Sequence, residues 1–282
     1  MKGEISTKTI HIVPISINFE RVIEGETFPF ELLGEEKVKE SFSRIVSSIN
    51  ILKKNFGRIF VEFCEPINLL SYKKGTESIE ERIEVIKKQV LFDLNERSVV
   101  MPTNIIASIL LMYRKGVTED LLISRSEWIA SEVSKRKKKI GSVADGSMQI
   151  PVRTAIKLLE KIIVKKKDMF GLSVTPRVDY KNILLLSYYR NALLNTFANE
   201  AILTCALVAF GHHIAWKEGI ERKRLVEEYR FLSELLAKEF IFVRFADDVI
   251  VKMIELAVIK EEDKKIKVFL YVFYHIYRYK GE

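Results

Sequence analysis

The sequence predicts an α/β remnant, that is, two or so strands of a parallel sheet with helices, followed by a mostly α-helical C-terminal region. Residues 10–17 and 58–67 are rich in β-branched and aromatic side chains, which favour strands. Residues 36–54 lie between them and repeat apolar side chains at helical spacing. A strand, a helix and a strand in that order predict a parallel crossover. From residue 76 onward, amphipathic helical patterns follow one another.

The first predicted strand, residues 10–17, is apolar on both faces and is interrupted by Pro14. Proline has no N–H to donate to a central ladder, so we expect it at a strand end or a bulge. The helix predicted at 36–54 is followed by an NFG stretch, whose Gly57 is expected in the left-handed conformation that ends a helix. Two strands alone do not complete a parallel sheet, because such a sheet needs several strands and cover on both faces.

The helical region begins near residues 72–76, YKKGT, which we take as the boundary between domains at 1–75 and 76–282. Its first helix is amphipathic, with Thr76 as the expected N-cap and acidic residues in the first turns. The next helix begins after a proline signal and is expected to end at Gly116. Further helices are predicted at 119–139, 154–167, 180–198, 200–216 and 220–240, with helical segments between 248 and 280.

The charge balance is moderately basic, with 46 Lys and Arg against 38 Asp and Glu, a formal charge of +8 over 282 residues. Such a balance suits an anionic partner: nucleic acid, acidic lipid headgroups or a phosphorylated small molecule. The basic runs SKRKKKIG (134–141) and IVKKKD (163–168) are typical of solvated faces, and attraction to an anionic bilayer is their leading functional alternative. They lack the interleaved aromatic residues that stack bases, so we expect no nucleic-acid partner.

Cys64 and Cys205 are far apart in sequence and lie in apolar surroundings, which predicts two reduced core thiols and no disulfide. The first residues, MKGEISTKT, lack the apolar stretch of a secretory signal. No stretch reaches the ~20 consecutive apolar residues of a membrane span. The nearest stretch, AILTCALVAFG at 201–211, is expected to be a buried helix.

The histidines offer weak signals for chemistry. His212 and His213 are adjacent, and His213 precedes Glu218 by an offset that leaves the two side chains about 140° apart on an α-helix. We expect the pair to be structural or solvent-facing, and His11 and His275 to lie at the edge of a core. We find no spaced metal ligands, glycine-rich phosphate loop or nucleophile elbow. We therefore predict no metal site and no catalytic residue in this chain.

Ordered stretches along the chain resemble a known family. HIVPISINFERVIEGETFPFELLGEEKVKES, at residues 11–41, resembles the last conserved block of the glycerol-3-phosphate and dihydroxyacetone-phosphate acyltransferases. NFGRIFVEFCEPINL, VMPTNIIASILL, YYRNALLNTF and EYRFLSELLAKEFIF are similar to later stretches of that family, in the same order. The similar stretches run from about residue 10 to residue 242, and the last two lean toward the dihydroxyacetone-phosphate enzymes.

The resemblance implies transfer of a fatty acyl group from acyl-CoA to dihydroxyacetone phosphate, or to glycerol 3-phosphate, in ether-lipid and glycerophospholipid synthesis. The family's proton-abstracting motif, H-x-x-x-x-D, is absent, because the residues five places after the four histidines are Ser16, Lys217, Glu218 and Lys280. This chain alone is thus expected to be inactive, either as a fragment or truncated gene model or as a degenerate paralogue. The alternative is a non-catalytic helical module that binds an anionic membrane surface or a partner protein.

The resemblance also places the VPIS stretch beside the acyl-CoA and acceptor pocket. The candidate substrate-binding residues are Val13, Pro14, Ile15, Ser16 and Arg21. The alternative for the first four is that they simply pack a sheet. Arg21 has the paired donors that meet a phosphate, and a surface salt bridge to Glu20 or Glu24 is its alternative. Arg190 lies inside an apolar helix, where a guanidinium needs a partner, most often a structural carboxylate.

The partners implied by the resemblance are acyl-CoA, a phosphorylated triose or glycerol, and an anionic membrane surface. Acyl-CoA is a substrate of this reaction, so no cofactor is expected. The implied location is membrane-associated, with the peroxisome first and the mitochondrial outer membrane or the endoplasmic reticulum as alternatives. The basic helices are expected to lie against a membrane face without crossing it.

Overall fold

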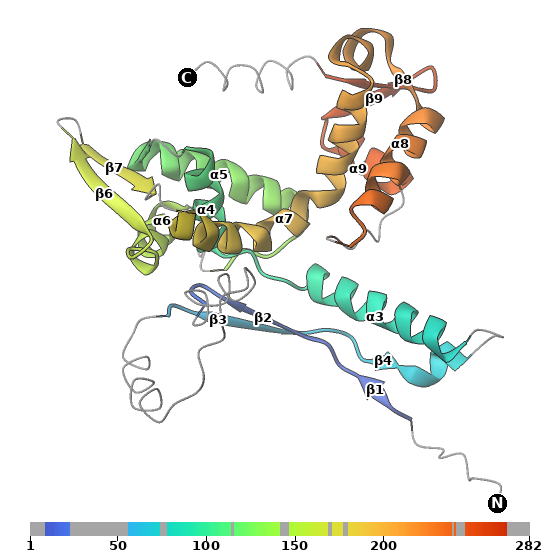
Figure 1. The fold of residues 1–282 in the computed structure, drawn as a ribbon, viewed down its shortest axis with the longest axis horizontal. Helices are drawn as coiled ribbons and strands as arrows, with labels where there is room; N and C mark the ends of the chain where they lie inside the picture. Colours follow the sequence, from blue (N-terminus) through green and yellow to red (C-terminus); the bar gives the residue numbers. More distant parts are fainter. Residues whose placement is uncertain are drawn as a thin grey trace, which may run out of the picture. The chain divides into compact units, whose positions relative to one another are not determined.

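The computed structural model describes residues 9–22, 56–73, 78–113, 116–141, 147–168, 171–176, 180–238, 240 and 246–269 (Figure 1). The predicted helix at 36–54 and His275 lie outside these residues. The chain divides into two compact units, unit 1 (Met1–Leu194) and unit 2 (Asn195–Glu282). The domain boundary predicted at 75/76 separates an α/β part from a helical region and does not correspond to the division between these two units. It stays a prediction.

A two-stranded β-ribbon carries the N-terminal part of unit 1. In it, β2 (Ile15–Phe19) pairs with β3 (Ile59–Phe63), and β1 (His11–Ile12) pairs with β4 (Ile67–Asn68). Both pairings are antiparallel, so the parallel crossover predicted for these strands is wrong. The residue at the end of β2 is the partner of the residue that begins β3, so the connection returns to the same end of the ribbon. The broader description of an α/β remnant before a helical region stays a prediction.

Pro14 lies at a bulge in this ribbon, as the sequence predicted. Between the pairs Ile12–Ile67 and Ile15–Phe63, the side of Pro14 has two residues (13–14), and the opposite side has three (64–66). The extra residue lets the ladder pass a proline that has no N–H to donate. The Pro14 carbonyl still accepts a hydrogen bond from the Cys64 N–H at 2.9 Å. At the other end of β3, Gly57 has φ +74°, which confirms its predicted left-handed conformation.

A short 3₁₀ turn, η2 (Leu69–Lys73), and the amphipathic helix α3 (Ile79–Glu96) follow the ribbon. The Ser78 hydroxyl accepts a hydrogen bond from the Glu81 N–H at 3.2 Å, and the Glu81 carboxylate accepts one from the Ser78 N–H at 2.8 Å. The N-cap is therefore Ser78, and the prediction of Thr76, which lies outside the described residues, is wrong. The capping box requires Glu three places after the cap, and only Ser78 has that spacing.

The core of unit 1 is built around α4 (Pro102–Met112), and α5 (Glu119–Lys135) and α6 (Gln149–Leu158) pack against it. Helix α4 has its proline in the first turn, as predicted, where a missing N–H costs no intrahelical bond. It ends at Met112, before the predicted end at Gly116. Its buried side chains include Ile105, Ile106, Ile109 and Leu110.

Unit 1 also contains a three-stranded antiparallel sheet, in the order β5 (Val117–Thr118), β7 (Gly171–Pro176), β6 (Ile163–Asp168). The helix predicted at 154–167 is therefore wrong in its second half. Helix α6 ends at Leu158, and the basic run IVKKKD forms β6 because every residue of that run pairs with β7. Tertiary pairing here decides the conformation of a run whose own pattern is ambiguous.

Helix α7 (Tyr180–Ala209) is one continuous helix where two were predicted, because no glycine or proline interrupts it. Its stretch Asn182–Ala209 is long and apolar enough to cross a membrane by length and composition, a test that core helices of soluble proteins also pass. The sequence expectation counted consecutive apolar residues, whereas mean hydropathy tolerates the interspersed Asn, Ser and Thr of this helix.

Unit 2 packs α8 (Arg222–Leu235), α9 (Ala246–Glu255) and a small antiparallel sheet around the C-terminal part of α7. The sheet order is β8 (Ile220–Glu221), β10 (Lys265–Val268), β9 (Ile259–Glu262). The β9–β10 hairpin corrects part of the helical tail predicted between 248 and 280. The fully buried core side chains include Leu203, Leu225, Ile250, Ile259 and Ile266.

His213 and Glu218 approach each other across a π-helical turn, η3 (Ile214–Glu218). Nδ1 of His213 lies 3.4 Å from a carboxylate oxygen of Glu218, and both side chains are exposed. The Gly219 N–H donates to the Ile214 carbonyl at 2.8 Å, and such a bond brings residues five apart onto one face. The α-helical argument that separated this pair is therefore wrong, whereas its predicted solvent-facing location is confirmed. His11 is also exposed.

Candidate functional site

The four candidate residues of the VPIS stretch point to opposite sides of the ribbon. Pro14 and Ser16 are buried, whereas Val13 and Ile15 are 45% and 43% exposed. Successive side chains of a strand alternate between faces, so these four cannot converge on one cavity. The Ser16 hydroxyl accepts a hydrogen bond from the side-chain amide of Asn18 at 3.1 Å. A substrate-binding role for the four residues stays a prediction.

Arg21 lies at the end of the ribbon, beside Phe56. Its guanidinium carbon is 5.6 Å from the centroid of the Phe56 ring, within the range of a cation–π contact. Its backbone N–H donates to the Phe56 carbonyl at 3.2 Å. Both contacts hold Arg21 against the segment that leads into β3. Its predicted role in binding phosphate stays a prediction, and Glu24 lies outside the described residues.

Glu20 closes the same end of the ribbon, although the sequence suggested it only as a partner for Arg21. It is 4% exposed, and its carboxylate accepts a hydrogen bond from the Arg58 N–H at 2.7 Å. The Glu20 N–H donates in turn to the Arg58 carbonyl at 3.0 Å. Gly57 lies against this contact, because a Cβ added there would come within 2.8 Å of the Glu20 Cβ. The sequence feature that could have predicted this contact is an acidic residue at the end of one strand and an NFG turn before the next strand.

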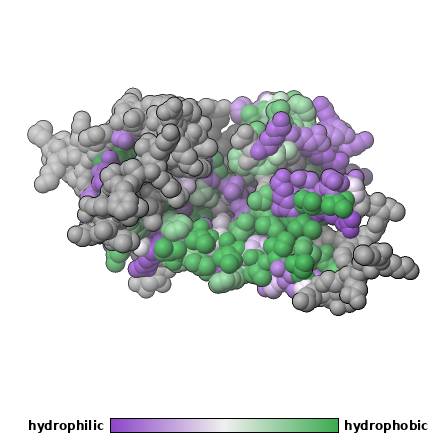
Figure 2. All heavy atoms as spheres, turned by 60° about the horizontal axis from the view of Figure 1, so that its bottom comes forward, coloured by the Kyte–Doolittle hydropathy of each residue, from purple (hydrophilic) through white to green (hydrophobic). Residues whose placement is uncertain are grey.

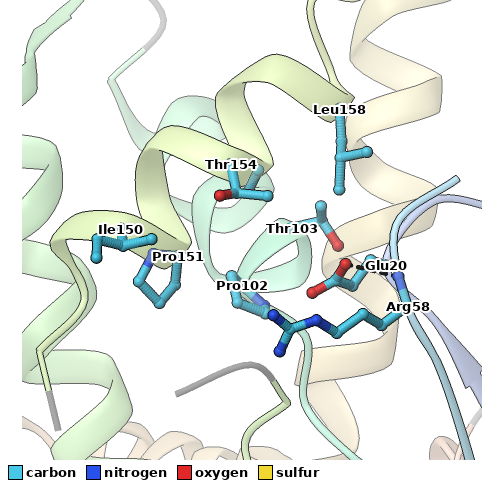
Figure 3. A pocket seen from close by; sticks show the side chains of 9 residues that line it. Glu20, Arg58, Pro102, Thr103, Ile150, Pro151, Thr154 and Leu158 are labelled. Carbon is cyan, nitrogen blue, oxygen red and sulfur yellow. Dashed lines mark hydrogen bonds between the residues drawn. The ribbon is translucent and has the colours of Figure 1, made fainter. Parts of the chain in front are cut away.

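An open hollow lies beside Glu20, where the ends of several elements meet (Figure 3). Its empty volume is about 360 Å³, including space open to solvent. Residues from the first turn of α4 and from one side of α6 form its largely apolar wall. The polar groups that line it are Glu20, Arg58, Thr103 and Thr154.

Thr103 directs its hydroxyl toward Glu20 (Figure 3). This side chain is fully buried, and its Oγ1 has no hydrogen-bond partner in the part of the chain that the structure describes. A buried hydroxyl without a partner costs about 1–3 kcal/mol, and at 0% exposure this oxygen is not accessible from the hollow. Among the described residues, no histidine or cysteine lines the hollow, so this lining offers no thiol or imidazole for covalent or base chemistry.

The basic run at 134–141 is largely engaged in structural contacts. Lys138 donates to the Asn95 carbonyl at 2.8 Å and to the Glu96 carboxylate at 3.1 Å, at the C-terminal end of α3. Lys139 pairs with Glu62 of β3 at 2.6 Å. Lysines at a helix C-terminus satisfy its last carbonyls and its dipole. These cations therefore join α3, α5 and the ribbon, and fewer of them are free to meet a bilayer.

Arg136 belongs to the same run and is held by Glu132 of α5. Its guanidinium donates to the Glu132 carboxylate at 2.9 Å and to the Glu132 carbonyl at 2.7 Å, and Lys135 donates to the same carboxylate at 2.7 Å. Burial of the Glu132 carboxylate raises its pKa, but the hydrogen bonds from Lys135 and Arg136 outweigh burial and lower the pKa overall.

Arg190, another predicted position of interest, is half-buried on α7. Its guanidinium donates to the side-chain oxygen of Asn191 at 2.8 Å, so the partner seen is a neighbouring amide where a carboxylate was expected. Cys64 is a buried free thiol, as predicted, whereas Cys205 is exposed, which corrects its expected core position. Among the described residues, no group of three or more His, Cys, Asp and Glu could hold a metal ion.

The sequence matches the family described as "Glycerol-3-phosphate acyltransferase C-terminal region" over residues 30–267. The chain belongs to this family. The predicted family is therefore confirmed. The matched range includes the NFG and PT stretches and begins after the VPIS stretch. The matched range crosses residue 75, where a domain boundary was predicted from the sequence.

Curated relatives of this family member carry two kinds of name. The chain is 28% identical to the dihydroxyacetone phosphate acyltransferase of Homo sapiens over 262 residues, which cover 83% of this chain and 37% of that protein. It is 27% identical to the glycerol-3-phosphate acyltransferase of Actinobacillus pleuropneumoniae serotype 3 (strain JL03) over 252 residues, 83% of this chain and 30% of that protein. It is 26% identical to the glycerol-3-phosphate acyltransferase of Pseudomonas aeruginosa (strain LESB58) over 277 residues, which cover 92% of this chain and 32% of that protein. The chain spans about a third of the length of these relatives.

Proposed function

We propose that this chain is the C-terminal portion of an acyltransferase that moves a fatty acyl group from acyl-CoA to a phosphorylated three-carbon acceptor. The observation that carries the proposal is the family match over residues 30–267. The acceptor is dihydroxyacetone phosphate or glycerol 3-phosphate, because the relatives named for these two compounds are 28% and 27% identical to the chain. Assays with both acceptors decide between them.

The chemistry requires a base that this chain does not supply. The acceptor hydroxyl attacks the thioester carbonyl, and a positioned base that takes its proton contributes about 10²–10⁴ in rate. None of the four histidines has an aspartate five places on, and no histidine of the described residues lines the hollow beside Glu20. We therefore place the base in polypeptide outside these 282 residues. A truncated gene product and a degenerate paralogue both remain compatible with this assignment.

The contribution of this chain to substrate binding lies at the end of the ribbon. Arg21 and the exposed Arg58 are both at that end, and acyl-CoA and either acceptor carry phosphate groups that guanidinium donors bind. Pro14 and Ser16 lie on the buried side of the ribbon, toward the opposite end of β2, whereas Val13 and Ile15 face away. We assign phosphate contacts to the two arginines and a positioning role to Pro14 and Ser16.

The test is an assay of acyl-CoA consumption with each acceptor. The chain alone should show no turnover above background. A fusion that joins the part of the human relative preceding its matched region to this chain should transfer the acyl group. Robust turnover by residues 1–282 alone would overturn the assignment of the base. An inactive fusion, when an intact human enzyme assayed beside it is active, would count against the proposed function itself.

A non-catalytic module that binds an anionic membrane surface is the second candidate, and the apolar helix Asn182–Ala209 favours it. The engaged lysines of the 134–141 run weaken it, because paired cations attract anionic lipid less strongly. Sedimentation with neutral and anionic vesicles separates the contributions. Binding that depends on anionic lipid and on salt indicates the basic run, whereas binding to both vesicles indicates α7.

A membrane-associated location in the peroxisome is part of the proposal, because the resemblance to the dihydroxyacetone-phosphate enzymes implies it. The mitochondrial outer membrane and the endoplasmic reticulum are the alternatives. Membership of ether-lipid synthesis follows only if dihydroxyacetone phosphate is the acceptor. Cell fractionation with markers for the three membranes tests the location directly.

A further inference from the structure

One face of the β2–β3 ribbon is apolar and exposed. The cross-strand partners Ile15 and Phe63, and next to them Ile17 and Val61, lie directly opposite each other and therefore point to the same face. We call this surface the outer face. It consists of residues that are between 43% and 65% exposed: Val13, Ile15, Ile17, Ile59, Val61 and Phe63.

The polarity of the ribbon is reversed relative to a sheet that covers a core and faces water. The side that includes Ser16, Asn18 and Glu62 is turned inward or half-buried, whereas the outer face carries only hydrocarbon side chains. An antiparallel sheet with one wet side places its polar residues on that side. Figure 2 shows hydrophobic residues gathered in a continuous band on the side that carries the ribbon. A contiguous apolar patch of this kind indicates an interface.

Within the part of the chain that the structure describes, the edges of the β2–β3 ribbon are open as well. Among the described residues, β2 pairs only with β3, and β3 only with β2. Each strand therefore presents a row of backbone N–H and C=O groups along its outer edge. An isolated two-stranded ribbon is marginal in water and gains stability from further strands or a covering layer. Open edges argue against lipid as the covering material, because hydrocarbon leaves backbone groups unsatisfied.

We propose that the outer face docks onto the part of the acyltransferase that, in the relatives, lies outside the matched region. The proposal rests on the proposed function. The matched family is described as a C-terminal region, and the chain corresponds to 37% of the human relative and 30% of the bacterial one. These relatives therefore hold additional polypeptide of the size of a domain. Such polypeptide supplies both hydrocarbon cover for the outer face and backbone partners for the open edges.

The experiment compares amide hydrogen exchange in this chain alone and in the fusion with the preceding part of the human relative. Amides of residues 13–19 and 59–63 should exchange at least about tenfold more slowly in the fusion. Dye that binds exposed apolar surface should bind the chain alone and be lost in the fusion. The double variant Ile17→Thr/Val61→Thr keeps β-branched side chains and should restore fast exchange in the fusion. The matched control Val251→Thr, at an exposed valine of α9, should change neither measurement.

Each result decides the proposal. Equal exchange in the two proteins overturns it. The proposal is also overturned if the chain alone is monomeric, binds no dye, and has its unfolding equilibrium constant raised several-fold by the double variant. Its own residues would then cover the outer face. If the chain alone is a dimer and the double variant makes it monomeric, the outer face binds a second copy of the chain. If vesicles bind the chain and displace the dye, the outer face binds lipid. Acyl transfer is measured in the same fusion: protection without turnover keeps the docking and rejects the proposed function, and turnover without protection does the reverse.

Discussion

The carboxylate of Glu20 accepts a hydrogen bond from the backbone N–H of Arg58 at 2.7 Å, and the two residues also pair through their backbones at 3.0 Å. This contact fastens the end of β2 to the start of β3, at the point where the connection between them leaves and returns. It gives the NFER and NFGR stretches of the sequence one shared structural role. Two of the five predictions below concern this contact, and three concern Lys138, Glu132 and the two thiols.

Gly57→Ala should destabilise unit 1. Its φ of +74° costs an L-residue roughly 1–2 kcal/mol, and its new methyl group would also crowd the Glu20 side chain. Gly211→Ala is the control, since Gly211 has φ +91° but nothing within 4 Å of the added carbon. Urea unfolding followed through Trp128 in unit 1 and Trp216 in unit 2 measures each loss. Equal losses for the two variants would show that crowding against Glu20 contributes nothing.

Glu20→Ala should lower the free energy of unfolding by about 1.5–3 kcal/mol, because a buried hydrogen bond to a charged acceptor is lost. Glu20→Gln keeps a side-chain oxygen near the Arg58 N–H and should cost less. Urea unfolding measures the difference. If Glu20→Gln is as damaging as Glu20→Ala, the charge matters and the hydrogen-bond geometry does not explain the contact.

Lys138→Met should destabilise the attachment of α3 by about 1 kcal/mol, because the Asn95 carbonyl and the Glu96 carboxylate lose their donor. Lys137→Met removes an exposed charge from the same run and should be neutral. Amide exchange along α3 checks both variants, and vesicle sedimentation shows whether either lysine meets lipid. Faster exchange in α3 for Lys137→Met alone would reverse the assignment.

The pH dependence of stability should include a contribution from Glu132. Its pKa is lowered in the folded chain, because the hydrogen bonds from Lys135 and Arg136 outweigh burial, so the ionised form is favoured by folding. That contribution is complete above the ordinary value of 4.5 and is lost as the pH falls below it. Glu132→Gln should therefore cost about 0.5–1 kcal/mol at neutral pH and progressively less in acid. Glu127→Gln, at an exposed position of α5, is the control.

The two thiols should react at different rates. Burial, and next the nearby charge of Asp93, raise the pKa of Cys64, so its thiolate is scarce and shielded. Cys205 is exposed and should react with a thiol reagent at least about tenfold faster. Cys205→Ser should remove the fast phase, and Cys64→Ser should leave it. A single phase with two equivalents in the native chain would contradict the buried position of Cys64.

Local pattern predicted the conformation of most segments correctly. The β-branched runs around Ile15 and Ile59 form strands, the P-T signal opens α4, and Gly57 takes the left-handed conformation. These features depend on neighbours in the chain, which a sequence displays directly. Two of the failures arose where local signals competed: Thr76 against Ser78 as a cap, and helix against strand for the IVKKKD run.

The candidate site was predicted less completely than the fold. The sequence pointed to the VPIS stretch and Arg21, whereas the structure divides that stretch between two faces and brings Glu20 to Thr103 beside a hollow. Glu20 and Thr103 are 83 positions apart in the chain, and no periodicity links them. Only the packing of α4 against the end of the ribbon makes them neighbours.

The order of short stretches was enough, without coordinates, to place this polypeptide in its family, because the order and spacing of residues along the chain are properties of the sequence itself. Folding alone settled that β2 and β3 run in opposite directions, that one side of their ribbon is bare hydrocarbon, and that a π-turn joins His213 to Glu218. Strand direction and exposure depend on which distant segments meet, and the π-turn on how one helix ends. Side-chain periodicity does not encode any of the three.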